Sequence, residues 1–167
     1  MLGTKAITAA FALAAICCAA DFNGVRALES ARTAVALGPR PAGSAAIAKL
    51  QAMIRAELKA VGWQVTEDVF TASTPAGKVT MRNIIGKLPG TSGRAVVFSG
   101  HYDTKAIPGV KFVGANDGGA STGFLLEMAR ALPTQPRKDD VMLVFFDGEE
   151  AFGDWSDTNG IYGSRHL

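Results

Sequence analysis

The sequence contains little cysteine, little net charge and no lysine- or arginine-rich run. Its 167 residues include two cysteines, Cys17 and Cys18, both near the N-terminus. The formal net charge is +2, which argues against a nucleic-acid-binding protein. After residue 20 there is no stretch of about 18 consecutive apolar residues, which excludes a protein with several membrane spans. The sequence also lacks a phosphate-binding glycine loop, a nucleophile elbow and, after residue 20, a Cys-x-x-Cys zinc motif.

The first 20 residues form a segment with its own composition. Lys5 is followed by an apolar run from Ala6 to Ala20 that ends in small residues. A run of this length is short for a membrane-spanning helix but typical of the core of a signal peptide. We therefore expect residues 1–20 to be a signal peptide or an N-terminal anchor. The mature domain, residues 21–167, is then expected to be secreted or periplasmic.

The rest of the chain alternates between helical and strand-like hydrophobic patterns. Apolar residues recur every three or four positions in three segments, which predicts helices over 22–35, 44–61 and 121–132. Alternating or continuous apolar residues predict strands over 63–71, 79–88, 95–99 and 141–146. The last two strands are unbroken apolar runs, as expected for strands that are covered on both faces. Strands that alternate with helices favour an α/β sandwich with a largely parallel centre.

Polar residues follow the two unbroken apolar strands. His101 and Asp103 follow the first, Glu149 and Glu150 follow the second, and Asp117 opens the helix between them. In open α/β sheets, ligands bind at the carboxyl ends of the strands. Carboxylates that gather there repel one another, and a bound dication removes this cost. Because His, Asp and Glu are ordinary zinc ligands, the sequence predicts a metal site built from strand ends.

Each of these residues also has a purely structural interpretation. Asp117 could be an ordinary helix N-cap, His101 a structural histidine, and Glu149 and Glu150 a solvated acidic turn. The metal site is favoured because three polar groups, namely His101 with Asp103, Asp117, and Glu149 with Glu150, are all expected at the same edge of the sheet. Asp103 lies two residues from His101, on the same side of an extended chain, and would orient the imidazole. Adjacent glutamates can face different ways, so that one binds metal while the other acts as a base.

Four stretches of sequence carry a family resemblance. They are PRPAGS at 39–44, HYDTK at 101–105, FVGAND at 112–117, and DGEEAF at 147–152 followed by Trp155 and YGSRHL at 162–167. In these stretches the chain resembles the animal-type glutaminyl-peptide cyclotransferases, which share the fold of the zinc-dependent aminopeptidases. The resemblance implies a three-layer α/β/α sandwich with a mixed, centrally parallel sheet. Two cations in these stretches, Arg40 and Lys105, are expected to make surface or loop contacts.

The resemblance also implies roles for individual residues. Asp117 and Glu150 would be zinc ligands, and Glu149 would be the proton shuttle. Trp155 would pack against the N-terminal glutaminyl residue of the substrate, although a tryptophan in such a loop could also simply cover an edge of the core. His101 corresponds to a ligand of the second ion in two-zinc aminopeptidases. Its counterpart in one-zinc cyclases lies near the ion without binding it, so its role stays open.

Three functions remain open. The first is cyclisation of the N-terminal glutamine of peptides or proteins to pyroglutamate, with release of ammonia, at one zinc ion. The second is a two-zinc aminopeptidase in which Glu149 activates water. The third is a truncated, non-catalytic module, because the family's domain is longer than this chain and its third zinc ligand, a histidine, lies beyond GSRHL. We therefore expect the chain to be the N-terminal part of the domain, unstable and inactive alone. Trp155 and YGSRHL favour the cyclotransferase.

Overall fold

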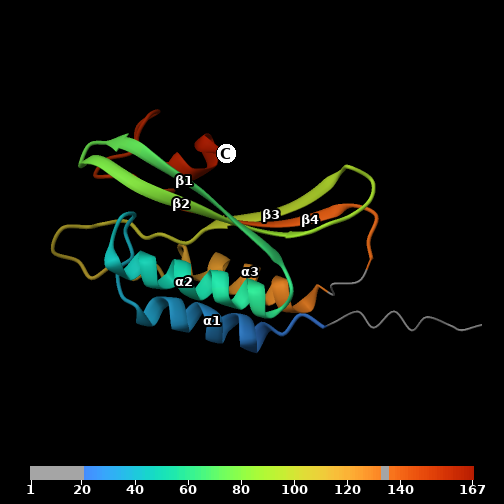
Figure 1. The fold of residues 1–167 in the computed structure, drawn as a ribbon. Coiled ribbons are helices and arrows are strands. Elements are labelled where there is room, and N and C mark those ends of the chain that lie inside the picture. Colours follow the sequence, from blue (N-terminus) through green and yellow to red (C-terminus); the bar gives the residue numbers. More distant parts are fainter. Residues whose placement is uncertain (1–20, 133–135) are drawn as a thin grey trace, which may run out of the picture.

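The computed structural model describes residues 21–132 and 136–167 (Figure 1). The helices and strands, in chain order, are α1 (Gly24–Ala36), α2 (Ala45–Ala60), β1 (Gln64–Thr74), β2 (Gly77–Leu88), β3 (Ala95–His101), α3 (Gly119–Ala131), β4 (Asp140–Phe146) and α4 (Tyr162–His166). The signal peptide or anchor predicted for residues 1–20 lies outside the described residues. Within the described ranges, no helix has the length and apolar character needed to cross a membrane.

The strands form one mixed sheet in the order β1-β2-β4-β3. The β1–β2 and β2–β4 pairs are antiparallel, whereas β3 and β4 run parallel. The helices α1, α2 and α3 lie on one side of this sheet and the short α4 lies on the other (Figure 1). Helix α2 packs on β1 and β2, α3 packs on β3 and β4, and α1 packs mainly on α3. The predicted α/β class with a mixed sheet is confirmed.

Helix α2 illustrates how the local sequence builds the core. The Ser44 hydroxyl accepts a hydrogen bond from the Ile47 amide at 3.1 Å and so caps the first turn. Apolar side chains then recur at three- and four-residue intervals, so they form one buried stripe: Ile47, Leu50, Ile54 and Leu58. The stripe joins a single core with side chains of the sheet and α3, among them Ile84, Leu125, Leu143 and Phe145. This core fixes the strand ends on which the site is built.

The two unbroken apolar strands differ in their surroundings. Strand β4 lies in the interior of the sheet between β2 and β3, as its composition predicts. Strand β3 is an edge strand of the described sheet, and the side chains of Val96 and Val97 are 46% and 53% exposed. The expectation that β3 is covered on both faces is therefore wrong for the described residues. A continuous apolar run shows that both faces can be buried, but it does not identify what covers them.

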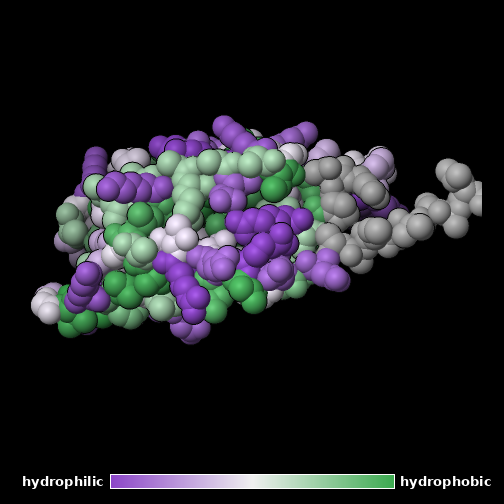
Figure 2. Space-filling view, turned by 90° about the horizontal axis from the view of Figure 1, so that it is seen from below, coloured by the Kyte–Doolittle hydropathy of each residue, from purple (hydrophilic) through white to green (hydrophobic). Residues whose placement is uncertain are grey.

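Helix α1 is present where predicted, but it buries its small residues. Ser30, Ala31 and Ala34 face the interior, whereas the larger Val25 and Leu28 are exposed. Small residues face the interior because α1 and α3 pack closely together. A Cβ atom at Gly123 of α3 would lie only 2.3 Å from the backbone oxygen of Ala27 in α1. Figure 2, viewed from the side on which α1 lies, shows hydrophobic groups interspersed with hydrophilic ones.

Candidate active site

The parallel pairing of β3 and β4 brings two polar segments to the same edge of the sheet. His101, the last residue of β3, pairs with Phe146, the last residue of β4. The chain continues from these positions into Tyr102-Asp103 and into Asp147–Glu150. Residues that are more than 40 positions apart in sequence therefore meet because their strands end in register.

Both ring nitrogens of His101 face carboxylates. Its Nε2 lies 2.9 Å from Asp117 Oδ1, and its Nδ1 lies 3.3 Å from Asp103 Oδ1. The imidazole thus connects the end of β3 to the segment that precedes α3. Burial alone lowers the pKa of His101, but the hydrogen bond to Asp103 and the charges of Asp103, Glu149 and Asp117 raise it to about 9.

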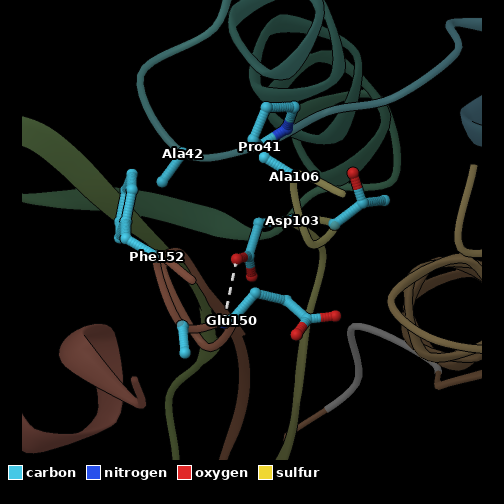
Figure 3. A pocket seen from close by; sticks show the side chains of 8 residues that line it. Pro41, Ala42, Asp103, Ala106, Glu150 and Phe152 are labelled. Carbon is cyan, nitrogen blue, oxygen red and sulfur yellow. Dashed lines mark hydrogen bonds between the residues drawn. The ribbon is translucent and has the colours of Figure 1, made fainter. Parts of the chain in front are cut away.

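Asp103 lies behind the acidic turn and holds it in place. Its side chain is buried, and its Oδ1 and Oδ2 accept hydrogen bonds from the backbone amides of Glu149 and Glu150, both at 3.1 Å. Figure 3 shows Asp103 and Glu150 together at a small pocket, with this contact to the Glu150 backbone drawn as a dashed line. The carboxylate of Asp103 therefore fixes the backbone that carries both glutamates.

Asp117 does not serve as the N-cap of α3. The cap position is occupied by Gly118, which makes no side-chain capping bond, and the Asp117 carboxylate instead meets His101. A tight backbone enforces this arrangement: Gly118 has a φ of 80°, and a Cβ atom there would lie 2.4 Å from the backbone oxygen of Asp103. The Asp117 side chain remains 55% exposed. It is thus accessible to a ligand.

The carboxylates of the site interact electrostatically. Burial raises the pKa of Glu150 to about 7, and the negative charges of Asp117, Asp103 and Glu149 contribute to this rise. Burial also raises the pKa of Glu149, with contributions from Asp103 and Asp117 that His101 and Lys105 partly offset. The charge of Asp117 is thus one of the causes of the raised pKa of Glu150.

The chemistry of this donor set fits a divalent cation. Carboxylate oxygens that destabilise one another's charge are stabilised by a cation among them, and zinc accepts Asp, Glu and His ligands. Across residues 21–132 and 136–167, however, no three His, Cys, Asp or Glu side chains are arranged so that they could together hold a metal ion. As predicted ligands, Asp117 and Glu150 would supply two oxygen atoms, and a zinc site would need a further ligand.

Trp155 lies on the segment that follows the acidic turn, and its side chain is 51% exposed. The Nζ atom of Lys105 lies 5.4 Å from the centroid of the Trp155 ring and 3.4 Å from the Ala151 backbone oxygen. Lys105 therefore joins the segment after β3 to the segment after β4. About half of Trp155 is therefore open to solvent.

Two buried groups near the site were not identified by sequence reasoning. Asp147, immediately before the glutamates, has no exposed surface and accepts hydrogen bonds from the Arg82 amide and Gln51 Nε2. Burial, assisted by the charge of Asp103, raises its pKa to about 7. Its position directly after an apolar strand was the available signal. Arg40 makes the expected loop contacts, but it does so inside the molecule, donating to the backbone oxygens of residues 38 and 113.

Comparison with known proteins places this site in a family. The profile of Peptidase family M28 matches residues 83–167, which include all six candidate site residues. The chain belongs to peptidase family M28. Most of the similar proteins are named glutaminyl-peptide cyclotransferase or glutaminyl cyclase, which confirms the resemblance deduced from the motifs.

Curated relatives carry the name glutaminyl-peptide cyclotransferase. The Drosophila melanogaster protein is 38% identical over 135 residues, covering 77% of this chain and 38% of its own length. The Gloydius blomhoffii protein is 43% identical over 121 residues, covering 64% of this chain and 33% of its own length. The M28 chain described here thus spans well under half the length of these relatives.

Two solved structures share the fold of this chain. An Acidobacteriales bacterium glutaminyl cyclase superposes with a TM-score of 0.82 and 42% identity, over 95% of this chain and 56% of that protein. A Zn-dependent exopeptidase from Parabacteroides distasonis gives a TM-score of 0.77 with 28% identity, over 89% of this chain and 56% of that protein. Both superpositions support the α/β architecture.

Proposed function

We propose that the protein is a zinc-dependent glutaminyl-peptide cyclotransferase that acts on the N-termini of peptides or proteins. The observation that carries this proposal is the convergence of Asp117, Glu149 and Glu150 at one sheet edge, next to the segment that carries Trp155. The names of its relatives in M28 support the same activity. An extracytoplasmic location, with residues 1–20 as the signal peptide, is part of the proposal.

Asp117 and Glu150 are the proposed zinc ligands, with a third ligand from outside the described residues. One bound ion is favoured, as the resemblance to the one-zinc cyclases implies, with His101 held near the site by Asp117 and Asp103. When bound, the ion supplies Lewis-acid polarisation of the γ-carbonyl of the substrate glutamine. Asp103 holds the backbone of Glu149 and Glu150, so that the two carboxylates keep their separate tasks.

Glu149 is the proposed proton shuttle. Its raised pKa brings it closer to the range in which a carboxylate both accepts and returns a proton near neutral pH. It takes a proton from the substrate α-amine as the nitrogen attacks the carbonyl carbon of the side-chain carboxamide, Cδ, and forms the ring C–N bond. It then returns that proton to the departing amide nitrogen, and the old C–N bond breaks with release of ammonia. Trp155 packs against the glutaminyl side chain during these steps.

Hydrolysis by a two-zinc aminopeptidase is the second candidate. The 2.9 Å contact between His101 and Asp117 favours it, because it places a histidine beside a carboxylate that could bridge two ions. Glu149 would act in both reactions: it would take a proton from the substrate α-amine in cyclisation and from a water molecule in hydrolysis. The peptide product therefore separates them.

The test is to load the longest form of the protein that its gene encodes with zinc, to incubate it with a peptide that begins with glutamine, and to identify the products by mass spectrometry. Cyclisation yields a peptide of unchanged residue count and free ammonia. Release of free glutamine would instead establish the aminopeptidase and overturn the proposal. Glu149→Gln should lower turnover by about 10²-fold or more. The matched change Glu29→Gln, at an exposed carboxylate of α1, should leave turnover unchanged.

A further inference from the structure

The position of Trp155 depends on the backbone beneath its ring rather than on the core. A Cβ atom at Gly160 would lie 2.1 Å from Trp155 Cζ3, so the ring rests directly on the Gly160 backbone, which has a φ of 122°. Since half of the side chain is exposed, core packing contributes little to its orientation. The shape of the segment 152–160 therefore determines where the ring points.

Asn159 holds that segment from the inside. Its side chain is buried, and its Oδ1 accepts hydrogen bonds from the Phe152 amide at 3.1 Å and the Tyr162 hydroxyl at 2.8 Å. Its Nδ2 donates to the backbone oxygens of Phe152 at 3.0 Å and Asp154 at 2.5 Å. These bonds use both donors and two acceptor sites of the amide, which ties the two ends of the Trp155 loop together.

Arg165 holds the same segment from α4. Its Nη1 and Nη2 donate to the backbone oxygens of Asp157 at 2.7 Å and Thr158 at 3.0 Å. Its guanidinium also lies over the Tyr162 ring, 5.4 Å from the centroid. A planar fork of this kind fixes two carbonyls at once, which a flexible ammonium does not do.

The clamp formed by Asn159 and Arg165 is connected to the acidic turn through the start of α4. The Ile161 amide donates to the Glu149 backbone oxygen at 2.7 Å, and the Tyr162 amide donates to the Gly148 oxygen at 2.8 Å. The loop that carries Trp155 is thus anchored on the same backbone that carries the proposed proton shuttle. Its geometry relative to Glu149 is set by these backbone bonds together with the clamp.

We propose that Asn159 and Arg165 are positioning residues that fix the Trp155 ring beside the acidic cluster. Neither side chain needs to touch the substrate to act, because each holds the backbone on which the ring rests. The positioning itself does not require any particular reaction. Its consequence for binding a glutaminyl side chain rests on the proposed cyclisation.

The first test follows the ring without any enzyme assay. The protein is labelled with 5-fluorotryptophan, so that Trp63 in the core and Trp155 on the loop each give a ¹⁹F resonance, which a Trp155→Phe variant assigns. Asn159→Ala and Arg165→Met are expected to shift or sharpen the Trp155 resonance and to leave that of Trp63 in place. Arg32→Met is the matched control for Arg165→Met, because Arg32 is exposed on α1 and lies outside the segment that carries Trp155. An unchanged Trp155 resonance, or equal changes in both resonances, would overturn the proposal.

The second test uses the zinc-loaded protein and a glutamine peptide. Asn159→Ala should raise KM by about tenfold with little change in kcat, and it should add nothing in a Trp155→Ala background because it acts through that ring. Additive effects of the two changes would contradict action through Trp155. If the resonance moves but KM does not, the positioning stands and the proposed contact of Trp155 with the glutaminyl side chain is wrong.

Discussion

The buried carboxyl group of Asp147 makes the stability of the fold depend on pH. Its folded pKa of about 7 lies above its unfolded value, so the folded state binds more protons between these two values. The free energy of unfolding should therefore fall as pH rises from about 4 to 7, by at most about 1.4 kcal/mol per pH unit from this group. Glu149 and Glu150, whose pKa values are also raised, add to the same trend.

Urea titrations of the metal-free protein at several pH values test this prediction. Asp147→Asn should flatten the dependence of the unfolding free energy on pH, whereas the exposed control Asp157→Asn should not. The side-chain amide introduced by Asp147→Asn can still accept a hydrogen bond from the Arg82 amide, so the variant is expected to fold. A pH dependence that is the same in both variants would show that Asp147 is not the responsible group.

Individual site residues could be predicted where local features decide their position. His101, Glu149 and Glu150 follow apolar strands, and two strands in register deliver them to one edge. The burial of Asp147 and of Arg40 could not be predicted, because it results from packing between segments distant in sequence. Nor does the sequence alone show that Asp117 faces His101 instead of capping α3.

At the scale of secondary structure, Glu127 joins α1 to α3. Its buried carboxylate accepts hydrogen bonds from the Asn23 amide at 3.0 Å, Arg26 at 2.7 Å and Arg130 at 3.3 Å. Glu127→Gln removes the charge on which both arginines depend and should lower the free energy of unfolding by about 2 kcal/mol. Thermal or urea unfolding measures the difference. Glu29→Gln on the exposed side of α1 is the control, and an equal loss in both would refute the role of Glu127.

Helices α1 and α2 show which features of a helix can be predicted from its own sequence. The stripe of α2 was predicted correctly because its period, its Ser44 cap and its burial all agree. For α1 the period predicts a helix, but the face that packs is set by the glycine of α3 against which it lies. The spacing of apolar residues within a helix does not determine the surface against which the helix packs. For this reason Val25 and Leu28 remain exposed although they fit the apolar spacing of α1.

At the scale of the whole molecule, β3 leaves an apolar edge exposed in the described sheet. Val96 and Val97 alternate to opposite faces, and both are about half exposed. Such an edge favours association between copies of the chain. Val97→Lys should lower the weight-average mass in sedimentation velocity experiments at high protein concentration. Ser73→Lys adds the same charge on β1, at the opposite edge, and should have no such effect; equal effects would contradict the role of β3.

The central claim is that Asp117 and Glu150 are held together because a divalent ion binds between them, while Glu149 stays free to move protons. Zinc titration by isothermal calorimetry of four proteins tests it most directly: the parent chain, Asp117→Asn, Glu150→Gln and Glu149→Gln. Zinc affinity should fall by about tenfold or more in the first two variants and stay at the parent value in Glu149→Gln. Equal affinities in all four proteins, or a loss confined to Glu149→Gln, would contradict the assignment.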